Sequence, residues 1–426
     1  MSEKYILGID IGTTSLSFVL TDESGNIIEA LNKASPPLNE EKTSDPDKIY
    51  SLVKSTVDEI TSKYNVKSIG FTGQMHGILY VDKNMNALSP LYTWQNKLCD
   101  LITESGITYA QQIFNITNTE IFSGYGLGTF YYHTKNALLP SYVYKLVSIM
   151  DFVALKLTGS NKPLLHTSVA ASFGLFDILN SKFNISAVCK LGLNPEILPD
   201  VTGEREIIGY YKNIPVYIPI GDNQASVLSS YCENSVILNY GTGSQMSVIT
   251  DKYREIKSLE TRPFTENRFM LCGAALCGGR AYALLEKFFR AYLKEATGKE
   301  ECQYETLNRL ALLGSGDMDF STKFAGTRNN PEEKASVNGI TENNFTPENF
   351  VYSLIKGMVQ ELYEFYKLTD EKCGKVILTG NGAGKNKALI KAAREIFGGE
   401  VLLSEIKEEA AYGAALFAGG TKNEKI

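Results

Sequence analysis

Two glycine turns with hydroxyl side chains carry the first chemical signal in this chain of 426 residues. They read GIDIGTTS at residues 8–15 and LNYGTGS at residues 238–244, and each lies between two runs typical of β-strands. Glycine lets the backbone approach a phosphate oxygen closely, while Thr and Ser hydroxyls and successive amide groups donate hydrogen bonds to it. One such turn is often an ordinary hairpin. The duplication predicts two hairpins that hold a nucleotide polyphosphate.

The two turns differ at one position that matters for metal binding. Asp10 lies two residues before Gly12, whereas Asn239 lies two residues before Gly241. A carboxylate holds Mg²⁺ directly or through water, and an amide is a much poorer ligand for a hard cation. We therefore expect Mg²⁺ on the side of the first turn and phosphate on the side of the second.

Two further segments offer side chains suited to a polyol. GQMHG at residues 73–77 follows a strand-like run, so Gln74, Met75 and His76 can line a pocket in which His76 donates to a hydroxyl. TWQNK at residues 93–97 holds the only Trp, whose ring can stack on a sugar while the adjacent amides bind hydroxyls. The alternatives are a tight turn with a surface histidine and a Trp in the core.

Asp222 is the candidate general base. GDNQAS at residues 221–226 follows the apolar run VYIPI, so the carboxylate emerges at a strand end. There it can accept a proton from an attacking hydroxyl during phosphoryl transfer. The alternative is a helix N-cap ahead of Gln224.

A glycine-rich stretch, ILTGNGAGKNKALI at residues 377–390, predicts a strand, a loop and a helix. Such a loop can accept an anion or let a flat base lie against the backbone. It lacks the Gly-Lys-Ser/Thr ending of a P-loop, and a plain connection between strand and helix is the alternative.

The elements that must position these residues alternate between strands and helices. Hairpins followed by this alternation occur twice, which predicts an α/β fold with a mixed sheet in each half. Ligands in such folds bind at the carboxyl ends of strands, where all of these segments fall. The length favours two domains, with a hinge expected near residues 225–234, and residues 96–160 are expected to be mostly helical.

Composition and charge narrow the functional class. Hydrophobic residues make up 43% and charged residues 21%, which is typical of a soluble globular enzyme. The net charge of -6 and the absence of a basic stripe argue against a nucleic-acid partner, and no apolar run is long enough for a membrane helix. The N-terminus lacks signal-peptide features and the seven cysteines are scattered, so we expect a cytoplasmic protein with reduced thiols.

Taken in order, these motifs resemble the FGGY family of carbohydrate kinases over nearly the whole chain. The resemblance implies two ribonuclease H-like domains of the actin-like ATPase type with a cleft between them, a sugar-binding one at residues 1–228 and a nucleotide-binding one at residues 229–426. It implies ATP, Mg²⁺ and a sugar as ligands, and it is compatible with a homodimer. The implied roles are metal binding for Asp10, general base for Asp222, phosphate contacts for Thr13, Thr14, Gly241 and Thr242, adenosine contacts for Gly382, Ala383 and Asn386, and sugar contacts for Gln74, Met75, His76, Trp94, Gln95 and Asn223.

Within the family, GQMHGILYV, LYTWQN, residues 170–177 and the GSQ after the second turn are most similar to sedoheptulokinases, and xylulokinases share GQMHG. The implied reaction transfers the γ-phosphate of ATP to a terminal hydroxyl of a ketose, with sedoheptulose as the first expectation. The alternatives are a pentulose or polyol kinase and a sugar- or nucleotide-sensing relative without turnover. Asn96 stands where relatives commonly carry an acid, and Thr129 and Tyr132 replace a Lys and a Trp, so these departures bear on the identity of the sugar.

Overall fold

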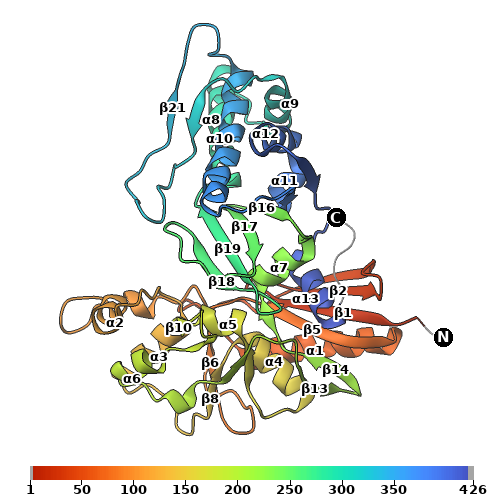
Figure 1. Cartoon of the computed structure of the whole chain (residues 1–426), viewed down its shortest axis with the longest axis vertical. Helices are drawn as coiled ribbons and strands as arrows, with labels where there is room; N and C mark the ends of the chain where they lie inside the picture. The colour runs from red at the N-terminus through yellow and green to blue at the C-terminus, as the bar shows by residue number, and fades with distance from the viewer. Residues whose placement is uncertain (1–2, 421–426) are drawn as a thin grey trace. The chain divides into compact units, whose positions relative to one another are not determined.

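The computed structural model describes residues 3–420 and forms two compact units (Figure 1). The first unit contains the chain up to Ser229, the segment Arg262–Arg268 and the segment that starts at Glu408. The second unit contains Ser230–Thr261 and Phe269–Lys407. Each unit has its own mixed β-sheet and helices, which confirms the predicted α/β class.

A seven-stranded sheet forms the centre of the first unit, in the order β13-β14-β5-β1-β2-β3, with β15 also paired to β5. Strand β2 is antiparallel to both β1 and β3, whereas β1 and β15 run parallel to β5. Ile11 lies beside Gly73, and Gly73 lies beside Gly221, so β1, β5 and β15 end at the same edge. The strands are β1 (Tyr5–Ile11), β2 (Ser15–Asp22), β3 (Ile27–Ala34), β5 (Val66–Gly73), β13 (Ile207–Tyr211), β14 (Ile214–Tyr217) and β15 (Ile220–Gly221).

Helix α13 (Glu409–Gly419) packs directly on this sheet although it comes from the end of the chain. Glycines in two strands permit the contact: a Cβ on Gly8 would lie 1.9 Å from the carbonyl oxygen of Ala411, and one on Gly70 would lie 2.1 Å from that of Ala414. The sequence-based division at residues 228 and 229 stays a prediction. By its contacts the helix belongs to the first unit, where its small apolar residues pack against Ile6.

The rest of the first unit is less helical than the sequence predicts. Residues 96–160 contain only three α-helices and one short strand, with loops between them. Asn118, for example, adopts a φ of 56° and ends the first of these helices after nine residues. The elements are β4 (Thr43–Ser44), α1 (Pro46–Lys63), β6 (Leu79–Val81), β7 (Leu91–Tyr92), a 3-10 turn (Leu98–Asp100), α2 (Tyr109–Thr117), α3 (Gly126–Lys135), β8 (Lys145–Val147), α4 (Ile149–Thr158), β9 (Leu164–His166), α5 (Thr167–Ser172), β10 (Phe176–Asp177), β11 (Lys182–Phe183), α6 (Ile185–Lys190), a second 3-10 turn (Pro195–Ile197), β12 (Asp200–Thr202) and α7 (Asp222–Ser230).

A six-stranded sheet in the order β18-β19-β17-β16-β22-β23 forms the centre of the second unit. The hairpin of β16 and β17 is antiparallel, and β22 runs parallel to β16, so Asn239 lies beside Thr379 at one sheet edge. The elements are β16 (Ser235–Tyr240), β17 (Ser244–Thr250), β18 (Glu260–Pro263), β19 (Phe269–Ala275), α8 (Gly279–Thr297), α9 (Tyr304–Leu313), β20 (Asp319–Ser321), β21 (Ser336–Asn338), α10 (Pro347–Leu368), α11 (Gly380–Lys385), β22 (Lys375–Thr379), α12 (Lys387–Phe397) and β23 (Glu400–Leu403).

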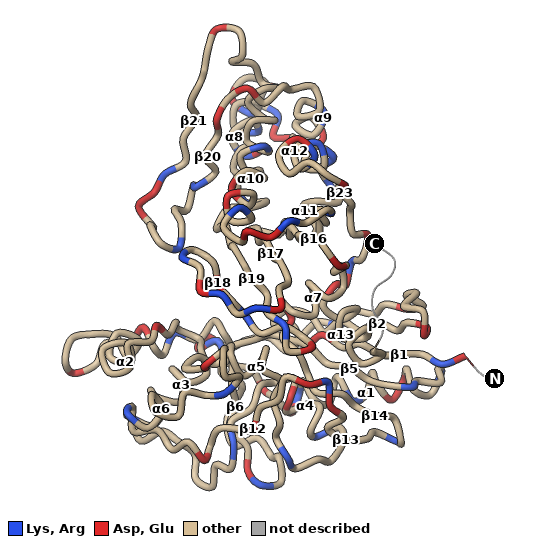
Figure 2. Tube along the Cα trace, viewed as in Figure 1, with Lys and Arg blue, Asp and Glu red and all other residues tan. Residues whose placement is uncertain are grey.

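Apolar side chains fill a core in each unit, among them Phe18 and Phe71 in the first and Leu238 and Leu354 in the second. Acidic and basic residues are interspersed along the trace of both units (Figure 2). Across residues 3–420, no helix is long and apolar enough to cross a membrane.

Candidate active site

Asp222 begins helix α7 at the edge where β1, β5 and β15 end. It is the first residue of the helix rather than the cap before it, and its Oδ1 accepts the backbone N–H of Asn223 at 2.7 Å. Burial raises the pKa of this carboxyl to about 6, although the Asn223 N–H and the positive charge of Arg262 oppose the rise. Asp222 is therefore mostly ionised at neutral pH, and its pKa is close enough to 7 for the carboxylate to accept a proton during the reaction.

Asp10 lies near the end of β1 at the same edge and has an electrostatic environment suited to a cation. Its Oδ1 is buried and has no hydrogen-bond partner among the described residues. Burial, followed by the negative charges of Asp222 and Glu408, raises the pKa of Asp10 to about 8. A cation would satisfy the buried oxygen and relieve the repulsion among the three carboxylates.

The residues around Asp10 fit a Mg²⁺ ion that is held mainly by water and phosphate. Residues 3–420 contain no group of three acidic, His or Cys side chains arranged to hold a metal. Mg²⁺ usually binds one or two carboxylates and keeps several waters or substrate phosphates as ligands. A single carboxylate such as that of Asp10 fits this pattern.

Arg262, in β18, is a site residue that the sequence reasoning missed. Its guanidinium Nη1 donates to the side-chain Oδ1 of Asn223 at 2.9 Å, and its charge lowers the pKa of Asp222. Arg262 lies outside every motif singled out in the sequence, and 39 residues separate it from its partner. Only the fold brings this charge to the candidate base.

The first glycine turn lies beside two of the predicted sugar residues. The N–H of Gly12 donates to the carbonyl oxygen of Ser15 at 3.0 Å and closes the turn. The Thr13 hydroxyl donates to the Oε1 of Gln74 at 3.4 Å and accepts the indole N–H of Trp94 at 3.0 Å. Thr14 is exposed, and Trp94 is 47% exposed, so the Trp is not a core residue.

His76 has a strained backbone, and a backbone carbonyl holds its ring. Its φ is +73°, a conformation that residues other than glycine rarely adopt and that is often found at functional sites. The ring Nδ1 lies 2.8 Å from the carbonyl oxygen of Ser172, which can only accept, so Nδ1 carries a proton. The ring also stacks on Tyr125, with centroids 4.4 Å apart.

The other predicted sugar residues differ in accessibility. Met75 is buried and lies against the end of β15, since a Cβ on Gly221 would lie 2.6 Å from its sulfur. Gln95 is half-buried, and Asn223 is half-buried with its carbonyl oxygen bound to Arg262.

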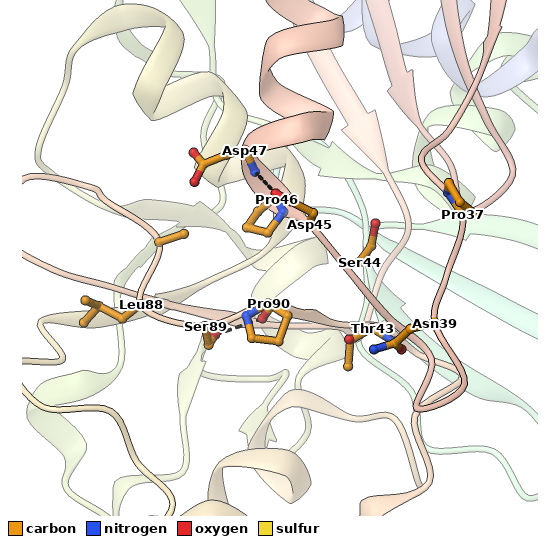
Figure 3. Close-up of a pocket in the computed structure, with 11 residues that line it drawn as sticks. Pro37, Asn39, Thr43, Ser44, Asp45, Pro46, Asp47, Leu88, Ser89 and Pro90 are labelled. Carbon is orange, nitrogen blue, oxygen red and sulfur yellow. Dashed lines mark hydrogen bonds between the residues drawn. The ribbon is translucent and has the colours of Figure 1, made fainter.

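Asn96, the departure noted in the sequence, shapes the loop that carries Trp94. Its Nδ2 donates to the carbonyl oxygen of Glu41 at 2.9 Å and its Oδ1 accepts the N–H of Leu98 at 3.0 Å. The same loop follows β7, which pairs with β4. A hollow of about 570 Å³ lies beside that pair and the start of α1 (Figure 3), and none of the predicted sugar residues lines it.

The second glycine turn, in the second unit, is braced by the start of α8. Gly241 and Thr242 are exposed, and their carbonyl oxygens accept backbone N–H groups of Gly279 at 2.9 Å and Gly278 at 3.0 Å. A Cβ on Gly278 would lie 2.4 Å from the carbonyl oxygen of Gly243. The Gly-Gly pair therefore lets a long helix abut the turn, and the positive end of that helix favours an anion there.

The glycine-rich stretch after β22 was predicted to be a loop, but it forms the short helix α11 (Gly380–Lys385). Burial of Ala383 in the apolar core outweighs the poor helix propensity of the glycines, so this side chain is not open to a nucleoside. A Cβ on Gly382 would lie 2.8 Å from the carbonyl oxygen of Tyr240. Asn386 is buried and caps α12 by accepting the N–H of Ala388 at 3.0 Å.

Comparison with known proteins assigns both halves of the chain to one protein family. Residues 5–229 match the N-terminal domain of the FGGY family of carbohydrate kinases, and residues 236–420 match its C-terminal domain. Mouse sedoheptulokinase is 23% identical, with 97% of each chain covered. Xylulose kinase of Staphylococcus xylosus is 22% identical, with 97% of this chain and 90% of the relative covered.

Solved structures agree on the fold. Gluconate kinase from Lactobacillus acidophilus superposes with a TM-score of 0.80 at 20% identity, covering 98% of this chain and 89% of that one. Xylulose kinase from the same organism superposes with a TM-score of 0.78 at 20% identity. The fold predicted from the sequence, with two domains of the actin-like ATPase type, is thereby confirmed. The chain belongs to the FGGY family of carbohydrate kinases, enzymes that use ATP as the phosphate donor.

Proposed function

We propose that this carbohydrate kinase phosphorylates a terminal hydroxyl of a ketose, with sedoheptulose as the preferred substrate and Asp222 as the general base. One observation carries the mechanism: a half-buried carboxylate with a pKa of about 6 begins α7 at the edge where Asp10 also lies. Asp222 accepts the proton of the sugar hydroxyl as that oxygen attacks the γ-phosphate of ATP.

Asp10 is proposed as the residue that holds Mg²⁺. The ion would neutralise phosphate charge when bound, and the unpartnered Oδ1 and raised pKa of Asp10 support this role. Thr13, Thr14, Gly241 and Thr242 are proposed to donate hydrogen bonds to the phosphates of ATP. Gly382 and Asn386 lie after β22, where we propose that adenosine binds against the backbone.

The sugar is proposed to bind beside Trp94. The exposed indole can cover the apolar face of a sugar, and its bond to Thr13 links that face to the phosphate turn. Gln74, His76, Gln95 and Asn223 would bind the hydroxyls.

The choice of sedoheptulose rests on the residue patterns of GQMHGILYV and LYTWQN and on the similarity to mouse sedoheptulokinase. Xylulose, or another pentulose, is the second candidate, because xylulokinases share GQMHG and xylulose kinases are similar over the whole chain. We also propose a cytoplasmic location, which the seven free cysteines support.

An ADP-release assay tests the substrate. The protein with ATP and Mg²⁺ is given sedoheptulose, xylulose, ribulose, glycerol and gluconate, and kcat/KM is compared. Sedoheptulose should give the highest kcat/KM, and sugar-dependent release should fall about 10²–10⁴-fold in the Asp222→Asn variant. A higher value for xylulose would replace sedoheptulose with the second candidate, and no turnover of any ketose would refute the proposal.

A further inference from the structure

The strand that leads into Asp222 is very short. Strand β15 consists of Ile220 and Gly221 and pairs with β5 at these two positions. Gly221 directly precedes Asp222 and has no side chain that could limit its backbone angles. The direction in which the Asp222 carboxylate leaves the sheet therefore depends on what else holds this strand.

Two side-chain hydroxyls hold the peptide group between Ile220 and Gly221. On one side the Thr72 hydroxyl, from β5, donates to the carbonyl oxygen of Ile220 at 2.8 Å. On the other side the N–H of Gly221 donates to the Oγ of Ser168, in α5, at 3.1 Å. Ser168 is fully buried, so loss of its hydroxyl would withdraw this acceptor from a site closed to solvent.

His166 sets the direction of the Ser168 hydroxyl. The ring Nδ1 of His166 accepts the backbone N–H of Ser168 at 3.1 Å, so this nitrogen carries a lone pair and no proton. The same nitrogen lies 2.8 Å from the Oγ of Ser168, and the hydroxyl must therefore donate its hydrogen to the ring. The lone pairs of Oγ are then left for the N–H of Gly221. Burial lowers the pKa of His166 to about 4, against a smaller opposing effect of the Gly203 backbone, so the ring is neutral at pH 7.

The ring of His166 is itself held in place within the first unit. His166 ends β9, which pairs with β12 at Thr202. Its ring lies edge-on to the ring of Phe417, with centroids 5.8 Å apart, and it is fully buried. A fixed ring can orient the hydroxyl of Ser168 in one direction only.

We propose that Ser168 and His166 are positioning residues for the general base. Ser168 fixes the peptide group that precedes Asp222, and His166 keeps the hydroxyl of Ser168 turned as an acceptor. The inference rests on the proposed role of Asp222. A general base must lie within hydrogen-bond reach of the proton that it removes, and a small displacement of a reacting group slows the reaction strongly.

Removal of the Ser168 hydroxyl tests the first step. Ser168→Ala should lower kcat with the best ketose about tenfold, while the KM values for ATP and sugar stay within about twofold. Rates are expressed per ATP-binding site counted by titration calorimetry, so that unfolded protein is not included. Ser353→Ala is the matched control: it removes a buried hydroxyl of the second unit that accepts the N–H of Met318 at 3.3 Å, and kcat should not change. An unchanged kcat in Ser168→Ala would overturn the proposal.

Two substitutions of His166 test the second step. His166→Phe keeps a ring against Phe417 but removes the acceptor, and kcat should fall about fivefold, as expected for one neutral hydrogen bond. His166→Asn offers a side-chain oxygen in place of Nδ1 and should keep kcat within about twofold of wild type. Equal losses in the two variants would show that the acceptor at Nδ1 has no part in positioning.

A double-mutant cycle with Asp222→Asn separates positioning of the base from general damage to the site. If Ser168 acts through Asp222, Ser168→Ala should slow the residual reaction of Asp222→Asn by less than about twofold, because no base is left to misplace. A further loss of about tenfold would overturn the positioning role and leave the assignment of the base intact. Full activity of Asp222→Asn alone would instead refute the general base, and the positioning role with it.

Discussion

Replacing Arg262 with Met should shift the acid limb of the pH–rate profile. In the native protein Arg262 lowers the pKa of Asp222, which burial raises to about 6. Loss of an opposite charge near a buried carboxyl raises its pKa by about one pH unit or more. At pH 6.5 the ionised fraction of Asp222 would then fall about threefold, whereas at pH 8 it would fall by less than about a tenth.

The assay is the kcat/KM for sugar, measured by ADP release from pH 5.5 to 8.5. Arg262→Met should be about threefold less active than wild type at pH 6.5 and nearly equal to it at pH 8. Arg262→Lys is the matched control, because it keeps the charge and should leave the limb near pH 6. A profile that falls uniformly at all pH values, with no shift of the limb, would show that Arg262 acts only by holding Asn223.

Three further substitutions probe other parts of the site. Asp10→Asn should stabilise the protein without Mg²⁺ by about 5 kcal/mol at pH 8 and by less than about 1 kcal/mol at pH 4, measured by urea unfolding. The reason is that the cost of ionising this carboxyl grows as the pH rises from its ordinary pKa towards its folded pKa of about 8. Gly278→Ala should raise the KM for ATP but not for sugar, since its Cβ would displace the turn at Gly243; equal KM values for ATP would contradict the bracing role. Trp94→Phe removes the donor to Thr13 and should raise the KM for sugar about fivefold, and an unchanged KM would mean that the indole N–H is not needed.

Local patterns were sufficient to predict the strand ends that carry the candidate chemistry. The alternation of apolar residues around Gly12 and Gly241 predicts two hairpins, and both are present. The apolar run before Asp222 predicts that this carboxylate emerges from a strand, as it does at the end of β15. These features depend on residues that are close in sequence, so hydrophobic periodicity and turn residues are sufficient to predict them.

Features that depend on contacts between distant residues could not be predicted. The bond between Arg262 and Asn223 and the packing of α13 on Gly8 and Gly70 join segments that no local pattern relates. The short helix α11 forms where glycines predict a loop, because the burial of Ala383 outweighs local propensity. In each case tertiary packing decides the structure.

The central claim is that Asp222 takes the proton of the sugar hydroxyl, and one comparison tests it most directly. ADP release by wild type and Asp222→Asn is measured at pH 7.5 with ATP and Mg²⁺, with and without the best ketose, alongside ATP binding by titration calorimetry. Sugar-dependent release should fall about 10²–10⁴-fold in the variant while ATP binding stays within about twofold. Full sugar-dependent release by Asp222→Asn would contradict the assignment of the base.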